Sequence, residues 1–461
     1  MNVNRRIIYT MVFMSVLFLS LIGYLTYFTL LPSAIIAHHG LDKRQWIYET
    51  STLRGIIYDR NDTVLAYTDP EDMQLRIYPY GSLYSHVIGY SSMVYGKSQL
   101  ESVYNDYLVG RDDFTIALGI SGAAEYGFDL TLTIDHELQQ VAEQNMKGNG
   151  AVVAINPKTG EVLALVSKPD FNPNEAELEA IWGEITESQD APLFPRATRG
   201  LYAPGSTFKI ITSAAAIEQG LDDRTFEDDG TVTIGGKIFK NYSNKKMGSL
   251  DLSRAFQLSS NIAFCILGSE MGGEVLSSVA GKFGFEKQTE FDLETSTSRF
   301  PIKSMSETDS AAAAIGQWEV LATPLEMALV TATIANNGIM QNPYILERAT
   351  NYNGAIIDEH DMQTGTRVIS TATARKIQAM MVETVKEGTG RSSALNDVQI
   401  AGKTGTAENE MTGKEHAWFV AYAPAENPTI AVAVIVEYSG TSGSESAAPI
   451  AREVIRNWVT R

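Results

Sequence analysis

Ser206 and Lys209 stand three residues apart at the start of an apolar stretch, in the sequence Ala-Pro-Gly-Ser-Thr-Phe-Lys-Ile-Ile. Proline and glycine end the preceding segment, and the apolar residues that follow recur at helical spacing. We therefore expect a buried helix to begin at or just before Ser206. Positions three apart share one face of a helix. The pattern predicts a hydroxyl beside an amine at a helix N-terminus, which suits a serine nucleophile with a lysine base.

Spacing alone does not single out this pair, because Ser243 and Lys246 repeat it. The second pair lies in a lysine-rich polar stretch without apolar periodicity, so no helix is expected to hold its two side chains together. The choice between the two pairs depends on partner residues elsewhere in the chain.

Ser259 and Asn261 form the only Ser-x-Asn pattern in the chain, directly after a helix-like segment at residues 252–258. A second hydroxyl can relay a proton between the amine and a leaving group. An amide can hold a substrate carbonyl while it also fixes the lysine. Taken alone, however, such a pattern is usually a helix cap.

Residues 401–407 read Ala-Gly-Lys-Thr-Gly-Thr-Ala, so small residues surround a cation in what we expect to be an edge strand. Lys403 with the hydroxyls of Thr404 and Thr406 suits a carboxylate at the end of a peptide. A lone Lys-Thr-Gly is usually a turn, as we expect for the second copy at residues 158–160. The specific signal is the joint occurrence of Ser-x-x-Lys, Ser-x-Asn and Lys-Thr-Gly-Thr in this order.

The chain begins with an uncharged apolar stretch from Ile7 to Leu31, long enough as a helix to cross a hydrocarbon core of about 30 Å. Arg5 and Arg6 precede it, which favours a cytoplasmic tail of residues 1–6 and places everything after Leu31 outside. A cleaved signal peptide is the alternative, but its apolar region is typically about 7–15 residues long. We therefore expect a retained single-pass anchor.

Composition, net charge, and cysteine and histidine content exclude several classes of function. The chain has 461 residues, 44% hydrophobic and 20% charged, as in an ordinary globular protein. Its net charge of −19 argues against nucleic acid as a partner. The single cysteine, Cys265, lies in an apolar run and is expected to be a buried core residue. Six scattered histidines form no cluster at metal-ligand spacing, so we expect neither a metal nor another cofactor.

Two regions follow the anchor. Residues 32–128 are expected to form a small, irregular extracytoplasmic module with a hairpin around Asn61-Asp62 and a helix over 100–108. Residues 129–461 would form the second domain. Its expected elements are a strand at 130–133, a helix from Asp135 to about Met146, hairpins at 151–166 and 417–436, a mostly helical middle at 206–340, and a closing helix at 448–459. Strands at both ends of a helical middle predict an α+β fold with one antiparallel sheet built from distant segments.

The three motifs together resemble those of penicillin-binding proteins and serine β-lactamases. The chain is similar to a class B penicillin-binding protein, a monofunctional transpeptidase of bacterial wall synthesis, of the penicillin-binding protein 2 and division transpeptidase type. Further similar segments lie at residues 54–61, 100–105, 156–162, 314–317 and 323–325. Gln99 and Trp318 depart from the family pattern, since each replaces a glycine. Neither change removes a catalytic group.

The resemblance implies a penicillin-binding transpeptidase fold, in which an antiparallel sheet carries a helical subdomain, and acyl transfer on a stem peptide ending in D-Ala-D-Ala. Ser206 would attack the penultimate carbonyl, neutral Lys209 would accept its proton, and Ser259 would pass a proton to the departing D-alanine. The implied catalytic residues are Ser206, Lys209, Ser259, Asn261 and Lys403, and the implied substrate-binding residues are Thr404, Gly405 and Thr406. Backbone N–H groups of Ser206 and Thr406 would form the oxyanion hole.

The same resemblance implies partners and a location. The partners would be peptidoglycan stem peptides, β-lactams as covalent inhibitors, and a membrane glycosyltransferase of the shape, elongation, division and sporulation type. The enzyme would be held at the bacterial cell membrane with its catalytic domain outside. Burial and the nearby Lys403 would lower the pKa of Lys209, the direction that a base needs.

Two alternatives stand beside this interpretation. A β-lactamase needs the same acylation residues, but the anchor and the N-terminal module argue against it, and the sequence places no carboxylate as a deacylating base. A non-catalytic scaffold could bind wall-synthesis partners through the module before Asp129, but the complete motif set argues for catalysis.

Overall fold

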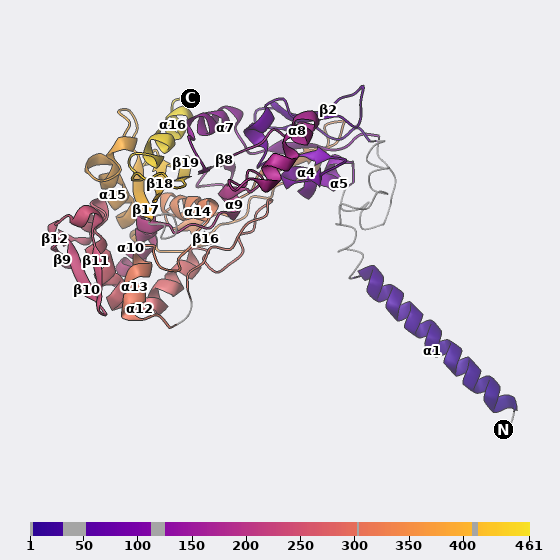
Figure 1. The fold of residues 1–461 in the computed structure, drawn as a ribbon, viewed down its shortest axis with the longest axis horizontal. Helices are drawn as coiled ribbons and strands as arrows, with labels where there is room; N and C mark the ends of the chain where they lie inside the picture. Colours follow the sequence, from indigo (N-terminus) through magenta and orange to yellow (C-terminus); the bar gives the residue numbers. More distant parts are fainter. Residues whose placement is uncertain (1–2, 31–51, 112–124, 302–303, 408–413) are drawn as a thin grey trace.

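The computed structural model describes residues 3–30, 52–111, 125–301, 304–407 and 414–461. Helix α1 (Val3–Leu30) covers the predicted apolar stretch (Figure 1), and its residues 5–24 have a mean hydropathy of 2.1 with none of them buried. Helix α12 (Asn261–Lys282) is the other described helix long and apolar enough to span a membrane, but it is 44% buried and packs against α13 (Glu307–Ala314). Helix α1 is therefore the candidate membrane span.

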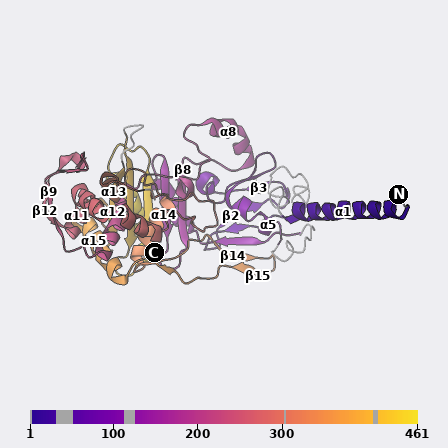
Figure 2. The same cartoon turned by 90° about the horizontal axis from the view of Figure 1, so that it is seen from below.

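A six-stranded sheet lies at the end of the body nearest α1 (Figures 1 and 2), in the order β15-β14-β6-β1-β2-β3. Its strands are β1 (Ile57–Tyr58), β2 (Val64–Thr68), β3 (Arg76–Ile77), β6 (Asp129–Leu132), β14 (Leu346–Thr350) and β15 (Ile356–Glu359). The predicted hairpin around residues 61–62 is confirmed as β1 and β2. The Asp59 carboxylate forms its turn by accepting hydrogen bonds from the backbone N–H groups of Asn61 and Thr63.

The sheet includes strands from both sides of residue 128, because β6 pairs with β1 on one edge and with β14 on the other. The module of residues 32–128 thus shares its sheet with later segments, and its boundary stays a prediction. The single helix expected over 100–108 is two short helices, α4 (Gln99–Val103) and α5 (Asn105–Leu108), because the backbone of Tyr104 departs from helical angles.

A second, five-stranded antiparallel sheet forms the centre of the larger domain, in the order β17-β18-β19-β7-β8. Its strands are β17 (Ala401–Ala407), β18 (His416–Ala423), β19 (Ile430–Val436), β7 (Gly150–Ile155) and β8 (Val162–Lys168). Both predicted hairpins are confirmed, and they meet where β19 pairs with β7. Strand β17 is an edge strand, as its small residues predicted.

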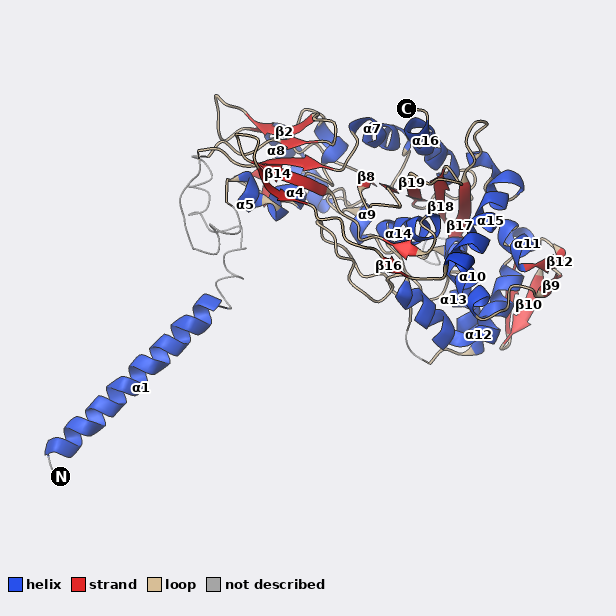
Figure 3. Ribbon diagram, turned by 180° about the vertical axis from the view of Figure 1, so that it is seen from behind, coloured by secondary structure: helices blue, strands red, loops and turns tan. Residues whose placement is uncertain are grey.

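Helices cover both faces of this sheet (Figure 3). On one face lie α7 (His136–Asn145), capped by the Asp135 carboxylate, and α16 (Ala447–Val459). On the other lie α14 (Pro324–Ala335), α10 (Lys209–Glu218) and α15 (Thr371–Glu387). Because strand side chains alternate between faces, Val152 and Ala154 join the first core while Ala151 and Val153 join the second. The predicted α+β fold is confirmed.

The predicted helical middle contains one feature that sequence reasoning missed. Residues 225–251 form a projection, here called the β finger, made of β9 (Thr225–Asp228), β10 (Thr231–Ile234), β11 (Lys237–Lys240) and β12 (Gly248–Asp251). It lies at the end of the body opposite the six-stranded sheet (Figure 2). Each strand has only four residues and few apolar side chains, so the period-two signal is weak. Helix α11 (Leu252–Gln257) follows it directly.

The remaining described elements are short connections, apart from one surface helix. They are η1 (Gly81–Tyr84), β4 (Ser91–Ser92), β5 (Gly96–Lys97), α8 (Glu175–Glu187), α9 (Arg196–Arg199), η2 (Gly205–Phe208), η3 (Tyr242–Asn244), β13 (Ile339–Met340), β16 (Thr366–Arg367) and η4 (Arg391–Ser393).

A buried ion cluster holds the N-terminal module together. The carboxylate of Glu101, which is fully buried, accepts hydrogen bonds from Arg54 and Arg76 at 2.7 Å each. Burial raises the pKa of Glu101, but the charges and hydrogen bonds of both arginines outweigh burial, so its net pKa lies below the ordinary value. Arg76 also donates to Gly55 O at 2.8 Å, which connects β3 to the chain just before β1.

We predict that Glu101→Gln destabilises the folded chain by about 3–5 kcal/mol, because it leaves two buried guanidinium groups without their counter-charge. Urea unfolding of the full chain in detergent measures this change, with the exposed Glu71→Gln as control. Because the folded-state pKa of Glu101 is depressed, its stabilisation is present above the unfolded pKa of about 4.3 and is lost as pH falls through the folded value. The difference from the parent chain should therefore shrink in acid, and a pH-independent difference would contradict an ionic role.

Candidate active site

Ser206 lies in a tight turn rather than in the α-helix expected to begin there. Residues 205–208 form the 3₁₀ turn η2, and α10 starts at Lys209. Gly205 causes the difference because its φ is +53°, a conformation that favours glycine. A Cβ on Gly205 would also lie 2.5 Å from Thr406 O, so only glycine lets the turn approach β17 this closely. Ser206 itself is half-buried.

Neighbouring segments fix this turn from two sides. The Trp418 indole on β18 donates a hydrogen bond to Ala203 O at 3.0 Å, and the Gly205 N–H donates to Gly316 O at 3.0 Å. The segment that carries Gly316 continues to Trp318, which is 39% exposed and has a positive φ of 65°. The departure from the family pattern at Trp318 thus lies two residues from Gly316, which is in direct contact with the turn that carries Ser206.

Lys209 is fully buried, and its amine reaches three oxygen atoms of the Ser-x-Asn motif. Nζ donates to Ser259 O at 2.8 Å and to Asn261 Oδ1 at 2.8 Å, and lies 3.4 Å from Ser259 Oγ. Among the described residues, Ser206 Oγ makes no hydrogen bond to the amine. The structure therefore brings Lys209, Ser259 and Asn261 into direct contact, and the neighbouring Ser206 hydroxyl has no hydrogen-bond partner within the described ranges.

Lys403 approaches the same hydroxyl from the sheet. Its Nζ donates to Ser259 Oγ at 2.8 Å and to Thr404 O at 3.0 Å, and its side chain is fully buried. Thr404 and Thr406 follow on the same edge strand, and the Thr404 hydroxyl lies 2.6 Å from that of Thr389. Gly405 packs against the turn that carries Ser206. An added Cβ on Gly405 would lie 2.9 Å from Thr207 Cγ2 and 3.0 Å from Pro204 O.

The electrostatic setting lowers the proton affinity of both amines. Burial is the main cause, and it brings the pKa of Lys209 to about 7, although Cys265 and Asp228 act in the opposite direction. Burial and the charge of Lys209 hold the pKa of Lys403 well below its ordinary value. Neither lysine forms an ion pair with a carboxylate in the part of the chain that the structure describes. A substantial fraction of Lys209 is therefore neutral near pH 7, as a general base requires.

Ser259 has an unusual backbone that aims it between the two lysines. Its φ is +59°, which is costly for a residue with a side chain. It occupies the junction between α11 and α12, and the next residue, Ser260, caps α12 by accepting a hydrogen bond from the Ala263 N–H at 3.1 Å. Asn261 is the first residue of α12. The Ser-x-Asn motif is thus a helix cap as well as part of the polar cluster.

The rejected alternatives lie elsewhere. Ser243 and Lys246 are exposed in the connection between β11 and β12, where the short 3₁₀ turn η3 ends at Asn244 and no α-helix joins the two residues. The second Lys-Thr-Gly, at residues 158–160, is the turn between β7 and β8, as predicted. Cys265 is buried, and burial raises its pKa to about 12, so it is a core thiol as expected.

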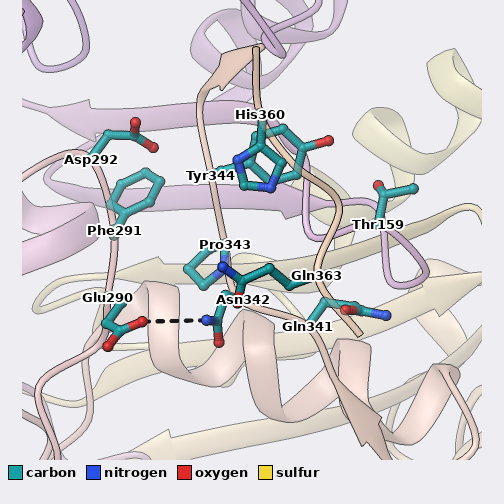
Figure 4. A pocket seen from close by; sticks show the side chains of 10 residues that line it. All are labelled: Thr159, Glu290, Phe291, Asp292, Gln341, Asn342, Pro343, Tyr344, His360 and Gln363. Atoms are coloured by element: carbon teal, nitrogen blue, oxygen red, sulfur yellow. Dashed lines mark hydrogen bonds between the residues drawn. The ribbon is translucent and has the colours of Figure 1, made fainter. Parts of the chain in front are cut away.

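A cavity of about 270 Å³ lies apart from this cluster (Figure 4). It is lined by Thr159 from the β7–β8 turn and by residues around 290–292, 341–344 and 360–363. The ring of His360 stacks on Tyr344, with centroids 3.5 Å apart. None of the eight residues predicted for the site lines this cavity.

Sequence reasoning missed two buried residues behind the Ser-x-Asn motif. Asp228 accepts a hydrogen bond from Ser260 Oγ at 2.6 Å, and Asn241 Oδ1 accepts one from the Asn261 N–H at 2.8 Å. Both belong to the β finger, and no sequence motif marks them. Only the proximity of that segment to Ser259 along the chain could have suggested a connection.

Comparisons with known proteins agree with this geometry. The family model of the penicillin binding protein transpeptidase domain matches residues 150–456, and that of the penicillin binding protein A dimerisation domain matches residues 54–123. The chain is 34% identical over 460 residues to the peptidoglycan D,D-transpeptidase PbpA of Mycolicibacterium smegmatis, with 90% of each chain covered.

Solved structures give the same result. A D,D-transpeptidase domain from Eggerthella lenta matches with 35% identity and a TM-score of 0.80, covering 89% of this chain and 99% of that one. The penicillin G acyl-enzyme complex of penicillin-binding protein A from Mycobacterium tuberculosis matches with 33% identity and a TM-score of 0.81, covering 89% and 100%. This chain therefore belongs to the class B penicillin-binding proteins, the transpeptidase family that its three motifs resemble.

Proposed function

We propose that the protein is a membrane-anchored peptidoglycan D,D-transpeptidase that forms an acyl-enzyme at Ser206. The observation that carries this proposal is the buried contact of Lys209 with Ser259 and Asn261, one helical turn from a serine with no competing hydrogen bond among the described residues. Relatives named as peptidoglycan D,D-transpeptidases and the penicillin G acyl-enzyme of a similar structure support it.

In the acylation step, the neutral Lys209 amine accepts the proton of the Ser206 hydroxyl. Two N–H groups of a neutral amine suffice for the hydrogen bonds to Ser259 O and Asn261 Oδ1, which leaves the lone pair for this proton. The Ser206 oxygen then bonds to the penultimate carbonyl carbon of the donor stem peptide. Backbone N–H groups of Ser206 and Thr406 would stabilise the charge that develops on the carbonyl oxygen.

Collapse of this intermediate breaks the carbon–nitrogen bond to the terminal D-alanine. Ser259 Oγ, 3.4 Å from Lys209 Nζ, can pass the proton from the lysine to the departing amine. An amine of a second stem peptide then attacks the acyl-enzyme, forms the cross-link and returns the proton to Ser206. A β-lactam would acylate Ser206 by the same attack on its ring carbonyl.

The edge strand β17 would hold the donor peptide. Its outer edge is unpaired in the five-stranded sheet, so an extended peptide can lie along it as an added strand. Lys403 and the hydroxyls of Thr404 and Thr406 would meet the terminal carboxylate of the peptide. Gly405 keeps this strand close to the nucleophile turn.

Helix α1 would hold the enzyme at the bacterial membrane with the N-terminus in the cytoplasm, because Arg5 and Arg6 precede the apolar stretch. The anchor and the module from Arg54 to Tyr107 would contact a membrane glycosyltransferase, which supplies the glycan strands to be cross-linked.

A membrane-impermeant amine-reactive crosslinker, added to intact spheroplasts, should join the full chain to such a glycosyltransferase. An unmodified protein would contradict the orientation, and a modified protein without a glycosyltransferase in the cross-linked product would contradict the partner.

Ser206→Ala should abolish covalent labelling by a fluorescent penicillin, because the other hydroxyl of this turn, that of Thr207, is buried and donates a hydrogen bond to Pro204 O. Ser243→Ala is the matched control, since Ser243 has the same spacing to a lysine but should label normally. Gel fluorescence measures both, and an unchanged thermal midpoint shows that the variants are folded. Persistent labelling of Ser206→Ala would contradict the assignment. Multiple-turnover hydrolysis of nitrocefin by the parent chain would instead favour a β-lactamase.

The rate of acylation should rise with pH as Lys209 loses its proton. With a Lys209 pKa of about 7, the neutral fraction and hence the acylation rate constant should increase about tenfold between pH 6 and pH 8. Stopped-flow measurement with a chromogenic cephalosporin tests this. A rate that is flat across this range would mean that Lys209 is not the titrating base.

A further inference from the structure

The β finger contributes a buried carboxylate that binds the middle residue of the Ser-x-Asn motif, Ser260. Asp228, the last residue of β9, is only 1% exposed. It accepts hydrogen bonds from the Gly230 N–H at 2.9 Å and the Ser260 hydroxyl at 2.6 Å, and both its oxygens accept from Asn241 Nδ2 at 2.7 and 2.8 Å. No arginine or lysine pairs with it in the described part of the chain. A buried anion held only by neutral donors needs all of them, since each lost bond leaves charge uncompensated.

Asn241 connects Asp228 to the polar cluster of Lys209, Ser259 and Asn261. While its amide nitrogen is held by Asp228 and by Lys245 O, its amide oxygen accepts the Asn261 N–H at 2.8 Å. Asn261 is held on a second side because its own amide nitrogen donates to Lys240 O at 2.9 Å. The remaining atom of that amide, Oδ1, is the one that accepts from Lys209 Nζ. A continuous chain of hydrogen bonds thus runs from Asp228 through Asn241 and Asn261 to the amine.

We propose that Asp228 and Asn241 are positioning residues for the acylation step, which orient the Asn261 amide and the Ser259–Ser260 junction and thereby aim the Lys209 amine. The proposal rests on the function proposed above. It gives the β finger a role in the chemistry, because its two residues bind the Ser260 hydroxyl and the Asn261 N–H of the motif.

The orientation of Asn261 shows why such a support is needed. An amide can rotate by half a turn and present a nitrogen instead of an oxygen to its neighbour. Lys240 O and Lys209 Nζ require opposite ends of the Asn261 side chain, so the observed orientation is set by both contacts. The backbone N–H of Asn261, held by Asn241, fixes where that side chain starts.

Asp228 also acts on Lys209 through its charge. The groups that face the amine are Lys403 from β17, Cys265 from α12 and Asp228 from β9, and Asp228 is the carboxylate among them. Its negative charge raises the pKa of Lys209 and so opposes the larger effect of burial. Removal of this charge should therefore let the lysine lose its proton at a lower pH.

The test is the pH profile of acylation of the full chain by a chromogenic cephalosporin. Asp228→Asn should lower the acylation rate constant about tenfold at its optimum, because the amide supplies a donor where Ser260 and Asn241 need an acceptor. The acid side of its profile should also shift to lower pH. Asn241→Ala should lower the rate by a similar factor with a smaller shift, because the carboxylate remains.

Asp229→Asn is the matched control, since it removes the same charge from the adjacent, exposed residue. It should keep the rate and the profile of the parent chain. If Asp228→Asn does not fold, as judged by its thermal midpoint, Asn241→Ala carries the test alone. Acylation rate constants within twofold of the parent chain would overturn the positioning role. A decrease in the rate constant that is equal at every pH in both variants would also overturn it. Loss of labelling in Ser206→Ala would still stand, so the two proposals fail separately.

Discussion

Two amines share one hydroxyl in a place where neither has a carboxylate partner among the residues that the structure describes. Lys209 and Lys403 are both fully buried, and both reach Ser259 Oγ. Burial of an unpaired ammonium is expensive, and the cost is reduced when the group loses its proton. Neutral oxygens and the rings of Phe264 and Phe256, whose centroids lie 5.3 and 5.5 Å from the two nitrogens, stabilise the ammonium groups, and the charge of Asp228 adds to this for Lys209. The lowered pKa of Lys209 is thus a consequence of where the fold places its side chain.

The fold maintains this arrangement through contacts between segments far apart in sequence. Lys209 comes from α10, Ser259 from the junction of α11 and α12, and Lys403 from β17. Close contacts at Gly205, Gly316 and Gly405 hold the turn before α10 against β17 and the segment after α13, and a Cβ at any of the three would meet an atom within 3 Å. Ser259, whose hydroxyl contacts both lysines, has a strained φ of +59° at this meeting point.

Sequence reasoning recovered the parts of this architecture that have a local signal. Both hairpins of the central sheet, the Asp135 cap and the edge strand of Lys403 follow from alternation, turn residues and small side chains. The 3₁₀ turn at Ser206 was missed because it depends on Gly205 meeting Thr406, a contact between residues two hundred positions apart. Strands β14 and β15 were missed for a related reason. They complete a sheet whose other strands lie near the N-terminus, and neither shows a strong apolar alternation.

The residues of the site also divide into those that a sequence motif marks and those that no motif marks. Ser206, Lys209, Ser259, Asn261 and Lys403 could be named because three short motifs occur together in order. Asp228 and Asn241 could not, since an aspartate and an asparagine in a polar segment are ordinary surface residues until the fold buries them. The burial of Asp228 beside the motif bears on both the anchoring of the β finger and the pKa of Lys209. Asp228 joins the β finger to the cap of α12 without a cationic partner in the described part of the chain, and the pKa of Lys209 is about 7 although the charge of Asp228 raises it. A displacement of Asp228 or Asn241 would therefore reach the Lys209 amine through Asn261. The exposed segment of Ser243 and Lys246 meets the same network, because Lys245 O accepts a hydrogen bond from Asn241 Nδ2.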